Sequence, residues 1–194
     1  MADQKISAMP SAATLTGAEL VPLVQSGANV KATLDSIRAL DNAYGGFSDS
    51  TDQTGSVSAG TVMTFDTIDV ADGVTLVSNS QITVPNTGKY NLQFSSQFKN
   101  TNNAQEDVTV WLRINGVDLA NSATQYTIPA RKSAGIFGYG VASLTFLLDL
   151  TANDYVQIVW LPTATTVTME HLPASVTPAY PAIPSVIVTM VQVA

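Results

Sequence analysis

The sequence predicts an all-β protein, a sandwich of two sheets built from about ten short strands. The β-branched residues Thr and Val occur 23 and 21 times in 194 residues, and both favour strands. The strong helix formers Glu, Lys and Arg are scarce, and turn-forming Asn, Asp, Gly and Pro clusters separate the apolar segments. Only one short segment has a helical pattern.

Residues 1–43 are predicted to form a separate docking segment. The segments 19–25 and 30–34 flank a four-residue loop at 26–29, which predicts a small hairpin, and a short helix is expected over 36–40. A hairpin and one helical turn bury little apolar surface, so this segment should be stable only when it packs on another protein. The side chains expected to make that contact are Ile6, Leu15, Leu20, Val21, Leu23, Val24 and Ile37.

Residues 44–194 are predicted to form the sandwich, because the glycine pair Gly45–Gly46 marks a boundary after which strand patterns follow one another. Tyr90, Leu92 and Phe94 alternate with polar residues, which is typical of a strand with one buried face. The expected strands cover residues 46–53, 62–69, 75–77, 81–84, 88–98, 108–114, 117–119, 138–150, 154–161, 165–170 and 185–193.

Composition excludes several classes of protein. Charged residues make up 12% of the chain and hydrophobic residues 45%, which is not the balance of a disordered chain. The formal net charge of −7 argues against nucleic acid as a partner. No apolar run approaches the roughly 18 residues of a membrane span, and residues 1–7 lack the apolar region of a secretory signal. With no cysteine, neither a disulfide nor a thiolate metal site is expected.

The charges are unevenly distributed along the chain. Between Tyr155 and Ala194 the only charged side chain is Glu170, although two strands are expected there. Solvated strands normally carry charges that prevent edge pairing, so these strands should be covered by the core on one face and by neighbouring subunits on the other. The residues predicted for a subunit interface are Trp111, Tyr155, Gln157 and Val159.

No catalytic or cofactor-binding constellation stands out, and an enzyme is not expected. His171 is the only histidine, and its neighbour Glu170 would point to the opposite side of a strand. A loop histidine is therefore favoured over a catalytic or metal-binding one. The basic pair Arg131–Lys132 is better explained as a loop cap than as an anion site.

Five carboxylates provide oxygen atoms that calcium prefers: Asp49, Asp52, Asp66, Asp69 and Asp72. They do not follow the spacing of a calcium loop, so solvated turn residues are favoured and no metal site is predicted.

Two further features leave alternatives open. Trp160 shares strand parity with Val156 and Ile158, which favours the core over a sugar-stacking platform. The proline-rich run 171–184 is interpreted as a connection that covers a sheet edge, or alternatively as a trimer-apex or host-recognition loop.

The order of strands and turns resembles the jelly roll shared by tumour necrosis factor and the globular head of complement C-one-q. The motifs that carry this resemblance are the Gly-x-Tyr of residues 88–90, the Asn-Gly turn at 115–116, the Asp-Tyr-Val of residues 154–156 and the closing strand 185–193. The resemblance covers nearly the whole of residues 44–194. It implies a ten-stranded jelly roll and a homotrimer with an adhesive or capping role.

A narrower resemblance points to tailed phages. Residues 43–54 and 181–189 look like the version of this jelly roll in phage structural proteins, and residues 5–25 are similar to the amino-terminal docking module of phage fibre and virion proteins. The resemblance implies a non-enzymatic virion protein, a homotrimeric fibre or spike-like appendage that binds other virion proteins through residues 1–43 and contacts a host receptor or glycan. The alternatives are a capsid decoration protein and a free bacterial adhesive or lectin-like module.

Overall fold

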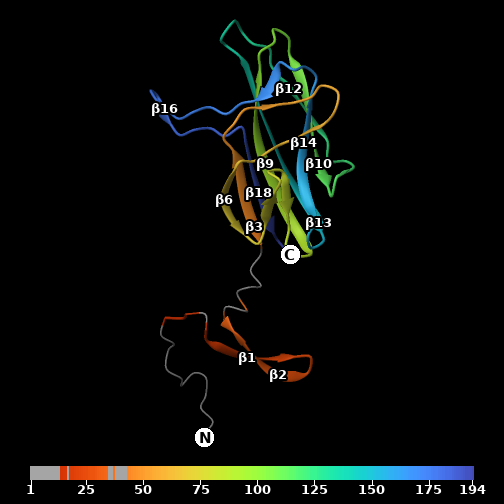
Figure 1. Ribbon diagram of the computed structural model, residues 1–194, viewed down its shortest axis with the longest axis vertical. Coiled ribbons are helices and arrows are strands. Elements are labelled where there is room, and N and C mark those ends of the chain that lie inside the picture. The colour runs from red at the N-terminus through yellow and green to blue at the C-terminus, as the bar shows by residue number, and fades with distance from the viewer. Residues whose placement is uncertain (1–13, 17, 35–36, 38–42) are drawn as a thin grey trace. The chain divides into compact units, whose positions relative to one another are not determined.

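A computed structural model describes residues 14–16, 18–34, 37 and 43–194. The chain divides into two compact units, Met1–Asp41 and Asn42–Ala194, whose boundary lies close to the one expected at residue 43. The described elements of both units are β-strands (Figure 1). The predicted all-β class and the sandwich are therefore confirmed.

The first unit contains a β-hairpin of β1 (Leu20–Gln25) and β2 (Ala28–Thr33). Its turn has two residues, Ser26 and Gly27, with φ angles of 52° and 79°. The expected four-residue loop is wrong, because a turn with two left-handed residues matches the twist of the strands and lets Ala28 pair with Gln25. Of the helix expected over 36–40, only Ile37 lies among the described residues.

The second unit is a jelly-roll-like sandwich of two antiparallel sheets with seven strands each, more than the ten expected. The first, the β9 sheet, has the order β4-β15-β9-β18-β3-β6, and β13 pairs along the other edge of β9. Its strands are β3 (Tyr44–Asp49), β4 (Gln53–Thr54), β6 (Thr67–Asp72), β9 (Gly88–Asn100), β13 (Gly138–Leu150), β15 (Val167–Met169) and β18 (Val186–Gln192).

The second, the β14 sheet, has the order β11-β10-β14-β8-β7, with β12 paired to β10 and β5 paired to β14. Its strands are β5 (Thr61–Val62), β7 (Thr75–Val77), β8 (Gln81–Thr83), β10 (Glu106–Ile114), β11 (Val117–Asp118), β12 (Thr124–Ile128) and β14 (Tyr155–Pro162). A separate small hairpin consists of β16 (Ser175–Val176) and β17 (Ala179–Tyr180).

The single strand expected over 62–69 is two strands in different sheets. Between them the chain crosses from the β14 sheet to the β9 sheet, and Met63 and Phe65 enter the core on the way. The apolar residues of this segment therefore mark a crossing between the two sheets. The backbone N–H of Met63 donates to the Ile158 carbonyl, and that of Phe65 to the Asn79 carbonyl.

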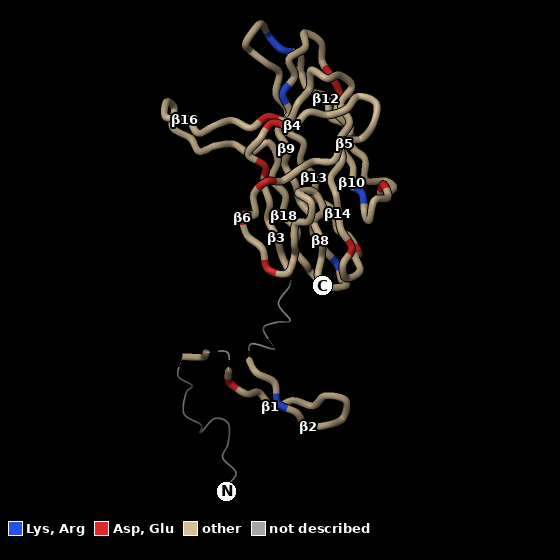
Figure 2. The backbone as a smooth tube through the Cα atoms, viewed as in Figure 1, with Lys and Arg blue, Asp and Glu red and all other residues tan. Residues whose placement is uncertain are grey.

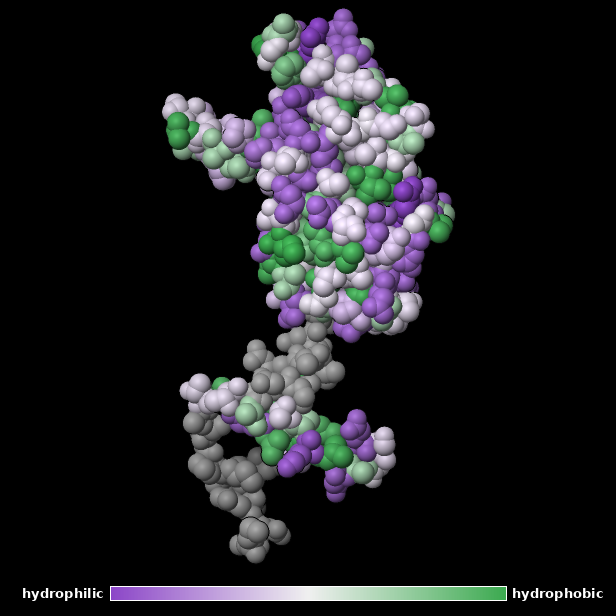
Figure 3. Space-filling view, viewed as in Figure 1, coloured by the Kyte–Doolittle hydropathy of each residue, from purple (hydrophilic) through white to green (hydrophobic). Residues whose placement is uncertain are grey.

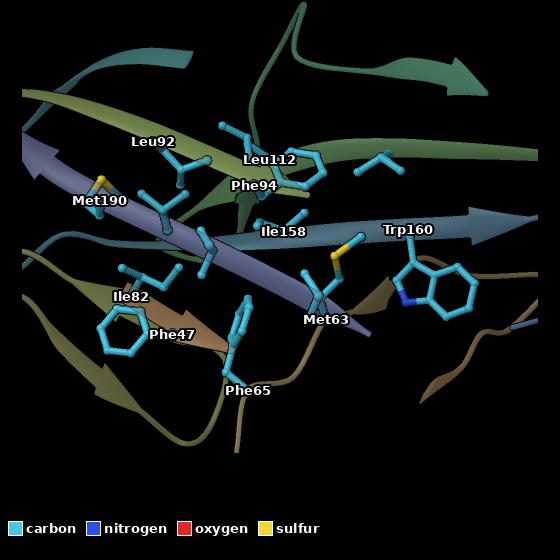
Figure 4. Packing of buried hydrophobic residues seen from close by; sticks show 14 of the residues in the cluster. Phe47, Met63, Phe65, Ile82, Leu92, Phe94, Leu112, Ile158, Trp160 and Met190 are labelled. Carbon is cyan, nitrogen blue, oxygen red and sulfur yellow. The ribbon is translucent and has the colours of Figure 1, made fainter. Parts of the chain in front are cut away.

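The core lies between the two sheets (Figure 4). Leu92 and Phe94 of β9 lie near Leu112 of β10 and Ile158 of β14, and all four are at most 1% exposed. Trp160 is fully buried, and its ring centroid lies 5.5 Å from that of Phe98, across the interface between the sheets. Trp160 therefore belongs to the core, as its strand parity indicated.

Candidate assembly surfaces

The interface predicted from the sequence lies on the outer face of the β14 sheet. Trp111 pairs with Val159, and Arg113 with Gln157, so these side chains share one face. Trp111 and Tyr155 are partly exposed, but Val159 is fully buried and Gln157 only 9% exposed. Gln157 also donates from Nε2 to Ser80 Oγ at 3.2 Å.

The chain itself covers this face. β5 pairs with β14 at Val159 and Trp160, and Gly60 just before it lies against the face. A Cβ atom added to Gly60 would lie 2.5 Å from Trp111 Cζ2 and 2.7 Å from Val159 Cγ1, so only glycine fits there. The expectation that neighbouring subunits contact Gln157 and Val159 is wrong, because residues of the same chain already bury both side chains.

Trp111 is held in place by a polar group at the rim of this face. Asp118 Oδ1 accepts hydrogen bonds from Trp111 Nε1 and from Arg113 Nε, both at 2.8 Å. These two donors, Trp111 first, lower the pKa of Asp118 below its usual value. Trp111 keeps some exposed surface, but its indole N–H is already satisfied within the chain.

The outer face of the β9 sheet is open and carries no charge over four rows of residues. We call this surface the outer face, and it consists of outward residues of β9, β13 and β18: Asn91, Gln93, Ser95, Gln97, Val141, Ser143, Thr145, Leu147, Ile187, Thr189 and Val191. Each alternates with a residue that points toward the core. Leu147, Val141, Ile187 and Val191 are 68%, 58%, 44% and 41% exposed.

Ion pairs mark both ends of the outer face. At one end Lys89 and Asp149 lie 2.6 Å apart in solvent. At the other end Lys99 Nζ lies 2.5 Å from Glu170 Oε1, with both side chains mostly buried. The hydrogen bond to Glu170 raises the pKa of Lys99. The charges at these two ends are thus paired, and the rows of β9, β13 and β18 between them hold only apolar and neutral polar side chains. Asp69 and Asp72 lie beside the outer face on β6, where Asp69 accepts a hydrogen bond from Ser48.

Apolar side chains continue beyond the outer face onto β3 and β6. Tyr44, Ile68 and Val70 are 39%, 60% and 54% exposed. Figure 3 shows hydrophobic residues gathered where Figure 1 draws β6, β3 and β18. A shallow hollow on the outer face is lined by Gln93, Phe94, Ser95, Ile187 and Thr189. This combination of apolar area and missing charge is typical of a contact surface.

β13 forms a long edge of the sandwich. It has 13 residues, pairs with β9 alone among the described strands, and contains one charged residue, Asp149. Proteins usually protect such an edge with lysines, prolines or bulges, or they cover it. β13 lacks the first two devices, and β12 of the same chain lies beside part of this edge, where the Tyr126 hydroxyl donates to the Ser143 carbonyl at 3.2 Å.

Residues 172–183 form an arm that projects from the sandwich (Figure 1). Leu172 and Ile183 pair at its base through two backbone hydrogen bonds of 2.9 and 2.8 Å. Beyond them β16 and β17 pair, and Val176 near the tip is 91% exposed. The expectation that this run covers a sheet edge is wrong for the single subunit, since residues 173–182 are exposed apart from the half-buried Ser175.

The hairpin unit exposes three of the seven predicted docking residues. Leu15, Leu20 and Val24 are 55%, 55% and 68% exposed. Val21, Leu23 and Ile37 are half-buried, and Ile6 lies outside the described residues. Within 14–16, 18–34 and 37, no side chain is buried. The hairpin is therefore a two-stranded sheet without a core of its own, as expected for a segment that needs a partner surface.

Four of the five candidate calcium ligands, Asp49, Asp52, Asp66 and Asp69, already accept hydrogen bonds from the protein. Asp49 accepts from Thr51 and Thr64, Asp66 from Ser50, and Asp69 from Ser48. The hydrogen bond from the Ser50 hydroxyl is the main cause that lowers the pKa of Asp66. The described part of the chain holds no group of three or more Asp, Glu or His that is placed to bind a metal ion.

The remaining candidates lie in loops. The backbone N–H of His171 donates to Asp52 Oδ1 at 2.8 Å, which joins the base of the arm to the turn after β3. Arg131 and Lys132 lie on an exposed loop, where their backbone N–H groups donate to the carbonyls of Asn102 and Ile136. These are structural contacts of the backbone, in agreement with the interpretation of both segments as loops.

Compared with known proteins, the chain matches no family model and no curated sequence. Among the described residues there is no helix of the length and apolar character needed to cross a membrane.

Proposed function

We propose that this chain is a non-enzymatic structural protein of a tailed-phage virion. In this proposal it forms a homotrimeric fibre or spike-like appendage, anchored to other virion proteins through residues 1–43 and exposed to the host surface. The jelly-roll-like sandwich agrees with the motifs that resemble this class of proteins. Capsid decoration is the alternative placement within the same particle.

The observation that carries the proposal is the contrast between the two units. The sandwich has a large core of its own, whereas the described hairpin residues have no buried side chain. A segment that cannot fold stably alone, attached to a domain that can, is the arrangement expected of an anchor and its head. The exposed apolar residues Leu20 and Val24 supply the contact area that the anchor needs.

The outer face supports self-assembly. Two copies with a net charge of −7 each repel one another over most of their surfaces. They approach at the least electrostatic cost through surfaces without charge, and the outer face is such a surface. The long β13 edge next to it gains protection from the same contact.

Deletion of residues 1–41 tests the anchor and leaves Ala43, which belongs to the core of the second unit, in place. The truncated chain should keep the oligomeric state and thermal unfolding of the full chain, because the sandwich contains its own core. It should be missing from particles assembled with it in place of the full chain. Incorporation at the full-chain level would show that residues 1–41 are not the anchor.

The number of copies per purified particle tests the placement. An appendage predicts a small multiple of three copies, and a decoration protein predicts hundreds. Quantitative protein staining of purified particles distinguishes the two. If the chain is absent from particles that are produced in its presence, the virion proposal is wrong and a free adhesive module becomes the better interpretation.

A further inference from the structure

We propose that the arm, residues 172–183, packs on the outer face of a neighbouring copy of this chain. This inference rests on the homo-oligomer of the proposed function and adds the contact that links one subunit to the next. It uses neither the virion placement nor the anchor, so it can be tested on the purified chain.

The composition and exposure of the arm are those of a segment that contacts another molecule. It contains no charged residue, and Figure 2 shows it without charge along its whole length. Its paired strands have only two residues each, too few for a free hairpin to be stable in water. Val176 at 91% exposure and Tyr180 at 41% are the large side chains that would gain most from burial.

The arm is long enough to act as a clasp. Five to six residues of extended chain separate its base at Leu172 from its tip, which corresponds to roughly 17–20 Å. Its prolines at 173, 178 and 181 lack the N–H group that pairing with a strand edge requires. The arm is thus better suited to pack side chains on a sheet face than to extend the β13 edge.

The outer face matches the arm in chemistry. Both surfaces lack charge, and the outer face offers a shallow hollow beside Ile187 and Thr189. The groups next to this hollow are neutral, so burial under an apolar arm would strand no charge. A contact between the arm of one copy and the face of the next is heterologous, and such contacts close into a ring when the rotation permits. A trimer is one such ring.

Cysteine cross-linking tests the contact directly, because the chain has no cysteine of its own. The double variant Val176→Cys with Thr189→Cys places one thiol near the arm tip and one on the outer face. The matched control pairs Val176→Cys with Val117→Cys, since Val117 is 71% exposed on β11 of the other sheet. We expect about tenfold more disulfide-linked multimers from the first pair, because a disulfide requires close Cα atoms.

A mixture of the two single variants shows that the link joins different copies. Val176→Cys mixed with Thr189→Cys should give linked dimers containing one chain of each kind, identified by a mass tag on one of them. Equal linking in the Val117→Cys control, or linking only within one chain, would overturn the proposal.

A charge on the arm provides an independent measurement. Val176→Asp should raise the dissociation constant of the oligomer by about tenfold or more, because the contact would then bury an unpaired carboxylate. Val117→Asp should leave it unchanged. The thermal unfolding of both variants should match the parent at concentrations where all are monomeric.

Light scattering separates the failure of this inference from the failure of the proposed function. An oligomer whose stability does not respond to Val176→Asp, and which gives no link between arm and face, refutes the arm contact and leaves the homotrimer standing. A monomer at every concentration reached refutes both. An oligomer linked through the arm with a subunit number other than three supports the arm and refutes the trimer.

Discussion

The two sheets of the sandwich differ in how their outer faces are covered. On the β14 sheet, β5 and Gly60 of the same chain cover Val159, which is fully buried. On the β9 sheet, Ile187 and Val191 occupy equivalent outward positions and remain 44% and 41% exposed. The strands β14 and β18 both lack charge, but only β14 is covered on its outer face by its own chain.

Missing charge on a strand therefore has two physical causes. A strand can lack charges because its own chain buries both faces, as in β14, or because one face awaits a partner, as in β18. The sequence pattern is the same in both cases. The two cases differ in the path of the chain between Thr54 and Thr61. This segment lies against the outer face of the β14 sheet and leaves the outer face of the β9 sheet open.

The strongest test of the comparison places the same charge on both faces. Val159→Asp should destabilise the folded subunit by about 4 kcal/mol or more, since it buries an unpaired carboxylate. Val191→Asp should change the free energy of unfolding by only about 0.5 kcal/mol, because solvent reaches the new carboxylate. Urea unfolding followed by tryptophan fluorescence measures both, and similar losses would show that the two faces do not differ.

Alanine substitutions of two glycines test how tightly the outer face of each sheet is packed. Gly60→Ala should cost up to about 3 kcal/mol, because its Cβ would overlap Trp111 and Val159. Gly46→Ala on the β9 sheet is the matched control, with Val70 Cγ1 at 3.4 Å and Thr189 Cγ2 at 3.8 Å from the new Cβ. Its effect should stay within about 1 kcal/mol. If Gly60→Ala leaves the free energy of unfolding unchanged, the segment at Gly60 does not pack tightly on Trp111 and Val159.

The ion pairs at the two ends of the outer face should contribute different amounts to the free energy of unfolding. Lys99→Gln should cost about 1.5 kcal/mol, because it leaves the mostly buried Glu170 without its partner. Lys89→Gln should cost less than about 1 kcal/mol, since the pair with Asp149 is exposed. Thermal unfolding of the two variants gives the order, and the reverse order would contradict the burial of the Lys99 pair.

The smallest expected effect concerns pH and the rim of the covered face. The pKa of Asp118 is lowered in the folded chain, so its ionised form stabilises the fold above the usual aspartate pKa of about 3.9. This contribution disappears as the pH falls through the lower, folded pKa. Asp118→Asn should therefore be less stable than the parent near neutral pH and approach it in acid. Parallel pH profiles for the two proteins would exclude a role for Asp118.

Much of the fold can be predicted from the local alternation of apolar and polar residues. The strands at 75–77 and 138–150 have the predicted bounds, and the alternation of Tyr90, Leu92 and Phe94 placed these side chains in the core. Such strands can be predicted because their own sequence records which face is buried. The short strand β12 was missed, although the apolar residues Tyr126 and Ile128 alternate with polar ones there.

It is harder to predict from the sequence which surfaces are covered and which segments cover them. The sequence of residues 55–60 does not predict that Gly60 lies against Trp111, because this contact depends on how segments far apart in the sequence pack together. In the arm, β17 lies between Pro178 and Pro181, and prolines argue against a strand. The low charge of the late segment coincides with a buried outer face on β14, whereas β18 and the arm are exposed, and their covering by another copy stays a prediction.

The charge-free rows of the outer face have a consequence for the medium in which the protein assembles. Attraction between ions weakens as dissolved salt screens it, whereas contacts between neutral side chains contain nothing for simple salts to screen. Salt should therefore not weaken subunits joined through the outer face, and they should hold together better in brine than in dilute buffer, because salt screens the repulsion between copies of net charge −7. Sodium sulfate, which also strengthens apolar burial, should tighten the assembly further.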